Sequence, residues 1–211
     1  MHLIWIIGGY GGWQAAKFAA KEHGPHTACK RGRHIVAALM LVMGAGSAFP
    51  LEAQAQDAGE YSVKAAFLYN FAKFVEWPPE ALGGGSPVVL GVLGDDPFGA
   101  SIDQTVAGKT ANGRQILIRR LRWGQDLKQC QILFISSSER KRLKQILDAL
   151  RGSSVLTVGD MEQFSQQGGM IQFVIDQSRV RFEVNVGAAE QARLRLSSKL
   201  LALARSVRGK A

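Results

Sequence analysis

Two groups of polar residues are positioned to bind an ionic ligand at one edge of a predicted sheet. The first group, Asp95 and Asp96, follows a short apolar run at 88–94. The second follows an apolar run that starts at residue 130 and consists of three serines: Ser136, Ser137 and Ser138. Ligands of parallel α/β sheets bind beyond the carboxyl ends of the strands. Hydroxyls and free N–H groups at a helix start attract anions, so this edge is a candidate site for a phosphate-bearing or carboxylate ligand.

Helix capping is the competing interpretation of the same residues. Asp96 precedes Pro97, and an aspartate N-cap followed by proline at the first helical position is a common helix start. The serines also precede a helical pattern and would cap it. A phosphoacceptor domain, which holds Mg²⁺ with paired carboxylates, would need another aspartate where this chain has the serines. We therefore predict no metal and no other cofactor.

The chain beyond residue 55 lacks the side chains most often used for catalysis near neutral pH. All four histidines lie at or before His34, and of the two cysteines only Cys130 lies beyond the same point. A domain that begins at residue 56 therefore has no Ser-His or Cys-His nucleophile pair and no intramolecular disulfide. Cys130 starts an apolar strand pattern, which predicts a packed and inert thiol. An envelope hydrolase that uses carboxylates or lysine is the weaker alternative to a non-enzymatic role.

Residues 30–55 have the three parts of a secretory signal peptide. A basic cluster precedes an uncharged apolar run of 15 residues at 35–49, which is shorter than the roughly 20 residues of a membrane span. Small residues then form a cleavage site that ends at Ala55. We predict cleavage there and a periplasmic location; cleavage after Ala48 and an uncleaved anchor are the alternatives. Residues 1–29 are interpreted as an over-extended start.

The remaining 156 residues, 56–211, suit one domain with one core. They carry 21 Lys and Arg against 15 Asp and Glu, which gives a net charge of +6. This surplus favours anionic partners such as lipid head groups or acidic protein surfaces. It is spread along the chain, with one local cluster at 139–144. A solvated basic surface is therefore preferred over nucleic-acid binding.

The apolar periodicity predicts an α/β domain with a mostly parallel sheet flanked by helices. The first helix is expected to bury Val63, Phe67, Phe71 and Phe74 and to end at Pro78 and Pro79. Strands are predicted at 88–94, 114–121, 130–137 and 154–160. Helices are predicted from Asp96, from the serine triplet to Gly152, and at 161–167.

The end of the chain predicts an antiparallel β-hairpin and a closing amphipathic helix. Residues 170–176 and 179–185 both alternate, and a tight turn at Gln177 and Ser178 joins them. The residues expected to face the core are Ile171, Phe173, Ile175, Val180, Phe182 and Val184. The helix is expected to start after Gly187 and to bury Ala192, Leu196, Leu200 and Leu203.

Four segments in this order and spacing resemble the YfiR/HmsC-like family over residues 60–207. They are YSVKAAFLYNFAKFVEWP at 61–78, LGVLGDDPFG at 90–99, CQILFIS at 130–136 and GGMIQFVIDQSRVRFEVNVGAAEQARLRLSSKLLALA at 168–204. The first and last segments are specific in combination. The resemblance implies a secreted periplasmic regulator with an α/β fold, and not an enzyme.

Such regulators restrain an inner-membrane diguanylate cyclase by binding its periplasmic sensor domain, which lowers cyclic di-GMP and biofilm formation. The implied partners are this cyclase, an outer-membrane lipoprotein that sequesters the regulator, and a second copy in a homodimer. Better-studied members carry several disulfide-forming cysteines. Only Cys130 corresponds here, so a redox response would need an intermolecular bridge. The alternative function is a periplasmic small-anion-binding protein that uses the aspartate and serine edge.

Two surfaces are candidates for contact with a partner. One is the polar face of the second hairpin strand, with Arg179, Arg181 and Glu183. The other is the apolar surface of the first helix, with Phe67 and Phe71, unless the sheet buries it.

Overall fold

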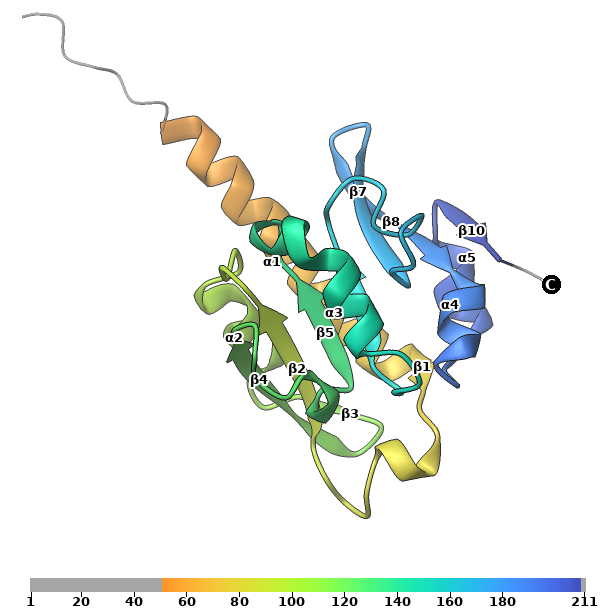
Figure 1. Ribbon diagram of the computed structural model, residues 1–211. Coiled ribbons are helices and arrows are strands. Elements are labelled where there is room, and N and C mark those ends of the chain that lie inside the picture. Colours follow the sequence, from red (N-terminus) through yellow and green to blue (C-terminus); the bar gives the residue numbers. More distant parts are fainter. Residues whose placement is uncertain (1–50, 210–211) are drawn as a thin grey trace, which may run out of the picture. The chain divides into compact units, whose positions relative to one another are not determined.

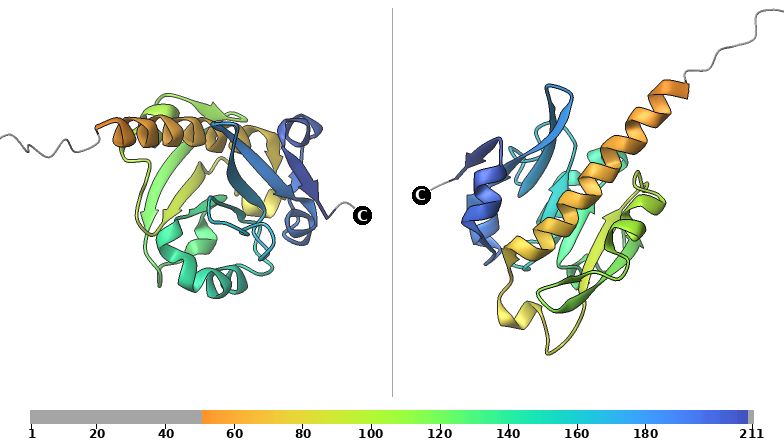
Figure 2. Two further views of the ribbon diagram at one scale, coloured as in Figure 1. Left: turned by 90° about the horizontal axis from the view of Figure 1, so that it is seen from above. Right: turned by 180° about the vertical axis from the view of Figure 1, so that it is seen from behind.

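The domain is built around a curled sheet that lies between two helical layers. The computed structural model describes residues 51–209. The helix α1 (Leu51–Phe74) crosses one face of the sheet and α3 (Leu143–Ala149) lies on the other, as the view from above shows (Figure 1, Figure 2). The predictions for residues 1–29 and for the chain before Leu51 lie outside the described residues. The predicted cleavage after Ala55 falls within α1.

The strands of the main sheet follow the order β10-β8-β7-β6-β5-β2-β4-β3. Its strands are β2 (Val88–Leu93), β3 (Thr110–Ala111), β4 (Arg114–Leu121), β5 (Ile132–Ile135), β6 (Leu156–Gly159), β7 (Ile171–Asp176), β8 (Arg179–Asn185) and β10 (Ser206–Arg208). Neighbours pair in parallel except β7 with β8 and β3 with β4. The predicted α/β fold with a mostly parallel sheet and a C-terminal hairpin is confirmed.

The two faces of the sheet carry separate hydrophobic cores. One core lies under α1 and α2 (Ala100–Val106) and includes Leu68 and Phe134. The other lies under α3 and includes Leu133 and Ile146. Every residue of β2 and β5 is buried. Burial on both faces explains why these strands appear in the sequence as continuous apolar runs.

The buried side of α1 differs from the predicted stripe. Phe71 is buried as expected, and Phe67 and Phe74 are half-buried, but Val63 is 46% exposed. The fully covered positions are Lys64, Ala65, Leu68, Phe71 and Ala72. The buried stripe is therefore rotated toward Lys64, Ala65 and Ala72, and Phe71 belongs to both the predicted and the observed stripe.

The helix α1 ends at Phe74, before the two prolines that were expected to end it. The next residues form β1 (Val75–Glu76), which pairs antiparallel with β9 (Arg195–Leu196). The prolines precede and start a short 3₁₀ helix, η1 (Pro79–Ala81). The backbone of this segment therefore bonds to the end of the chain instead of continuing the helix.

The hairpin β7–β8 forms with the predicted turn. Gln177 and Ser178 have φ angles of 48° and 59°, which suits a two-residue hairpin turn. Phe173 pairs with Phe182, and both rings contact Phe67 and Phe71 of α1 at centroid distances between 5.2 and 6.1 Å.

Two residues of the hairpin contradict the simple alternation. Ile175 was expected in the core but is 53% exposed, whereas Gln172, expected on the wetter face, is only 8% exposed. The register with β6 explains both, because Gln172 pairs with Gly159 at the end of β6 and Ile175 lies beyond that end.

The predicted helix at 161–167 is wrong, since these residues form turns. The Phe164 ring is fully buried and lies against the glycine backbone at Gly159 and Gly169. The Ser165 N–H and hydroxyl both donate to Gln172 Oε1, at 3.0 and 3.2 Å. The segment is thus held by the hairpin, not by helical hydrogen bonds.

The closing helix exists but is not continuous. It is divided into α4 (Val186–Gln191) and α5 (Ser198–Leu203), because Arg193 has a φ of 59° and β9 between them pairs with β1. Ser197 starts the second helix by accepting from the Leu200 N–H, a cap that the apolar periodicity concealed. Leu203, expected to be buried, is 57% exposed.

The close contact between Phe164 and Gly169 predicts a site of high mutational cost. A Cβ at Gly169 would overlap the Phe164 ring, so Gly169→Ala should lower the free energy of unfolding by about 1–3 kcal/mol, the usual cost of overpacking. Gly84 has open space around it and is the control. Urea denaturation measures both variants, and equal stabilities would contradict this packing.

Candidate functional site

The two predicted polar groups do share one edge, at the carboxyl ends of β2 and β5. The Asp95 N–H donates to Ser138 Oγ at 3.0 Å, and Ser138 Oγ lies 3.3 Å from Ser136 Oγ. Gly94, with a φ of 91°, makes the turn possible, since a Cβ there would meet Glu139 Cγ at 2.9 Å. Tertiary structure therefore joins residues that are about forty positions apart in sequence.

The polar groups of this edge are used in internal hydrogen bonds. Ser136 caps η3 (Ser137–Arg142), a 3₁₀ helix that precedes α3. Asp96 was predicted as the N-cap of a helix starting at Pro97, but α2 begins at Ala100. Its Oδ1 instead accepts from the Phe98 N–H at 2.8 Å, in the turn before the helix. The edge therefore offers capping geometry rather than a preformed anion site.

Hydrogen bonds from Arg120 connect β4 to the start of α2 beside this edge. Its guanidinium donates to Asp96 Oδ2 at 2.7 Å, Asp103 Oδ2 at 2.6 Å and the Gly99 carbonyl at 2.9 Å. The hydrogen bond from Arg120 lowers the pKa of Asp103, and the same contacts raise the pKa of the guanidinium. Because Asp96 is committed to this ion pair, it is not available as one of a metal-binding carboxylate pair.

A buried ionic network that the sequence reasoning missed lies on the next strand end. Lys64 of α1 is 3% exposed, and its Nζ lies 2.6 Å from Glu60 Oε1 and 2.7 Å from Asp160 Oδ2. Tyr61 donates to the same Asp160 oxygen at 2.8 Å, and its ring lies under the ammonium group at 4.1 Å. The available signal was the position of a lysine four residues before Leu68, on the buried side of the first helix.

A cavity of about 360 Å³ opens beside this network. It is lined by Glu60, Lys64, Asp160, Glu162, Gln172, Phe173, Val174, Ile175 and Arg205. A second cavity of about 620 Å³ lies between α3 and α4 and includes Leu147, Met170 and Ala192 in its wall. The smaller cavity combines carboxylates with apolar surface at the carboxyl end of a parallel strand, where α/β sheets usually bind ligands.

The residues of the predicted polar face of β8 differ in their exposure. Arg179 and Arg181 are exposed. The Glu183 side chain is 17% exposed, and its carboxylate lies 3.6 Å from the Arg205 guanidinium. The two arginines therefore remain a candidate contact surface, whereas Glu183 is partly covered.

The aromatic surface of α1 is mostly internal. Phe71 is 1% exposed and contacts the hairpin phenylalanines, and Phe67 is half-buried against the same rings. Phe71 is consequently not accessible to a partner in this domain, whereas Phe67 keeps part of its surface exposed.

Cys130 is buried, with 1% of its surface exposed. Burial raises the pKa of its thiol to about 11, with a smaller raising effect of Asp126 and an opposing effect of Arg119. A thiolate is the reactive species, so this environment makes the thiol unreactive. An intermolecular bridge through Cys130 would require the strand end to open.

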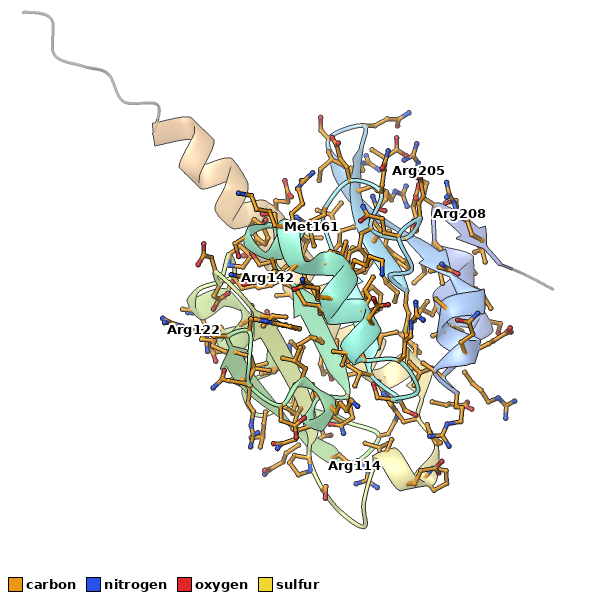
Figure 3. All side chains as sticks on the ribbon, in the orientation of Figure 1. Arg114, Arg122, Arg142, Met161, Arg205 and Arg208 are labelled. Atoms are coloured by element: carbon orange, nitrogen blue, oxygen red, sulfur yellow. The ribbon has the colours of Figure 1, made fainter. Side chains whose placement is uncertain are left out.

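The basic surplus does not gather on one surface. Arg114 and Arg122 lie near the β4 end of the sheet and Arg208 lies near the β10 end (Figure 3). Within residues 51–209, no helix is long and apolar enough to cross a membrane. The same part of the chain contains no group of three or more His, Cys, Asp or Glu side chains placed to hold a metal ion.

Comparison with known families identifies the family of the chain. The model of the YfiR/HmsC-like family matches residues 61–205, from the ionic network on α1 to the arginine before β10. The chain belongs to the YfiR/HmsC-like family. This family is periplasmic and regulatory rather than catalytic, and it is associated with diguanylate cyclase signalling.

Other comparisons give less. No curated protein matches the chain. A crystal structure of a conserved domain protein from Vibrio cholerae aligns with a TM-score of 0.45 and 11% identity, over 57% of this chain and 54% of that one. The aligned region thus spans about half of the length of that protein.

The Lys64 network predicts a large loss of stability when the ammonium is removed. Lys64→Met keeps the aliphatic stem but leaves Asp160 and Glu60 without their cation, and should lower the free energy of unfolding by about 3 kcal/mol. The double variant with Asp160→Asn should recover part of this loss, because the buried charge is also removed. Urea denaturation of both variants measures the difference, and a double variant no more stable than Lys64→Met would contradict the pairing.

The Cys130 environment predicts slow thiol modification in the folded protein. Raising the thiol pKa from 9.0 to about 11 lowers the thiolate fraction roughly a hundredfold at pH 8. Reaction with iodoacetamide should therefore be at least about a hundredfold slower in buffer than in denaturant. Non-reducing gels after diamide treatment should show no disulfide-linked dimer; such a dimer in the folded protein would contradict the packed thiol.

Proposed function

We propose that this protein is a periplasmic negative regulator that binds the periplasmic sensor domain of an inner-membrane diguanylate cyclase and lowers cyclic di-GMP output. The observation that supports this most is the family match over residues 61–205. The predicted signal peptide at 30–55 would deliver the domain to the compartment where such a sensor domain is exposed.

The proposed mechanism is a population shift in the cyclase. A bound regulator shifts an equilibrium between active and inactive arrangements only by its difference in affinity for the two. Stoichiometric binding of this kind needs a stable, complementary surface and no catalytic group. The fold supplies rigidity, because α1 packs on the sheet and on the hairpin that carries the candidate contact residues.

The exposed arginines of β8 are the proposed contact with the cyclase. Arg179 and Arg181 project from the same face of the strand, and Arg179 pairs with Asp176 in the register of the hairpin. Basic side chains on a rigid hairpin would meet an acidic surface and speed its capture. Release by an outer-membrane lipoprotein and formation of a homodimer are further proposals that follow from the family.

The small-anion alternative has less support from the geometry. Ser136, Ser138 and Asp96 already bond to groups within the domain. Neither of the two cavities described above is lined by them.

The proposal predicts that reversing the charge of the hairpin weakens cyclase binding. Arg179→Glu with Arg181→Glu should lower affinity for the purified periplasmic domain of the cyclase about tenfold or more, because an attractive contact becomes repulsive. The matched control is Arg122→Glu with Arg140→Glu, which changes the net charge equally at exposed positions elsewhere.

Surface plasmon resonance measures the affinity, and intracellular cyclic di-GMP measures the outcome. The hairpin variant should raise cyclic di-GMP relative to the control pair. Equal affinities for both pairs would exclude this surface. Failure of the unmodified protein to bind any periplasmic cyclase domain would contradict the proposed function itself.

A further inference from the structure

We propose that the cavity beside Lys64 binds an organic cation, with a guanidinium or ammonium group on an apolar stem. The first reason is that carboxylates outnumber cations around it. Lys64 is shared by Glu60 and Asp160, and Arg205 lies near both Asp176 and Glu183, at 3.7 and 3.6 Å. Asp176 also has Arg179 opposite it in the hairpin, so the excess of negative charge lies in the cavity wall itself, where Glu60, Asp160 and Glu162 accompany Lys64 and Arg205.

Glu162 adds a further carboxylate to the wall. Its side chain is exposed and lines the cavity from the turn that follows β6. The side chains of Asp160 and Glu60 are only 11% and 27% exposed. Carboxylates that are partly withdrawn from water gain more from an added cation than fully solvated ones.

The open edge of β7 supplies backbone acceptors in the same place. Asp176 pairs with Arg179 next to the two-residue turn. The backbone groups of Asp176 and of every second residue before it therefore point to β8, whereas those of Phe173 and Ile175 point away from β8. The Met170 carbonyl, which accepts from the Asn185 N–H at 2.8 Å, fits this alternation. The parallel pairing of Gly159 with Gln172 is the last one with β6 and uses the Phe173 N–H, so the Phe173 carbonyl and the backbone of Ile175 lie beyond the end of β6.

Apolar side chains complete the cavity. Phe173, Val174 and Ile175 line it, and Ile175 is 53% exposed although its sequence position suggested burial. The cavity volume of about 360 Å³ lies in the range of small-molecule sites. Arg205, labelled in Figure 3, also lines the cavity, from the segment that precedes β10. A guanidinium, with five donors in a plane, suits this combination of carboxylate and carbonyl acceptors above an apolar wall.

The test compares n-butylguanidinium with n-butylurea, which has nearly the same shape but no charge. Titration followed by ¹H–¹⁵N NMR should show butylguanidinium binding about tenfold more tightly, since hydrogen bonds to charged groups are the stronger ones. The amide shifts should centre on residues 160–162 and 173–175. Equal affinities for the two compounds, or shifts centred elsewhere, would overturn the proposal.

Matched variants assign the effect to the cavity. Glu162→Gln removes one exposed carboxylate and should weaken butylguanidinium binding about twofold to fivefold. Glu190→Gln removes an equally exposed carboxylate on α4, outside the cavity, and should leave the affinity unchanged. If both variants weaken binding equally, the binding is due to general charge attraction, and the proposed site in the cavity is wrong.

The same chemistry could come from a free cation or from an arginine of a docked protein. A capped peptide, acetyl-Gly-Arg-Gly-amide, distinguishes the two. Tighter binding of the peptide than of butylguanidinium assigns the cavity to an arginine side chain, whereas weaker or equal binding assigns it to a small ligand. This proposal does not depend on cyclase binding, because the titration uses the regulator alone.

Discussion

The packing of one helix across a curled sheet is the constraint on which the rest of the domain depends. Ala65, Leu68 and Ala72 are buried on the side of α1 that faces the core, and Phe67 and Phe71 contact the hairpin. This places the hairpin against the same helix that also closes the parallel part of the sheet. The position of the C-terminal hairpin therefore depends on its contact with the N-terminal helix α1.

Lys64 gives this packing an ionic component. A lysine with 3% exposure would be costly alone, but Glu60, Asp160 and the Tyr61 ring surround its ammonium group. Such networks contribute to the choice of one arrangement more than to net stability. Here the network fixes the position of α1 relative to the end of β6, which is also where the anionic cavity opens.

Functional surfaces arise where the regular elements stop. β6 ends at Gly159 while β7 continues to Asp176, which leaves an uncovered strand edge and an exposed Ile175. By contrast, the edge formed by β2 and β5 is closed with serine hydroxyls and an arginine. Two strand ends of one sheet thus differ: one is closed by internal bonds, and the other has a cavity and an exposed Ile175.

The sequence alone determined the periodic features and the family. Continuous apolar runs predicted β2 and β5 because burial on both faces requires them, and alternation with a tight turn predicted the hairpin at Gln177 and Ser178. The absence of histidine beyond His34 and the order of four motifs favoured a regulatory role over a catalytic one.

Tertiary structure decided what local pattern could not. The closing helix was divided because residues 195–196 pair with a strand more than a hundred positions earlier. The turns at 161–167 replaced a helix because Phe164 packs between two glycines and Ser165 bonds to Gln172. Lys64 and Asp160 are distant in sequence and are brought together by the folded structure. In each case a contact between distant residues outweighed local preference, and a distant contact leaves no periodic signal in the sequence.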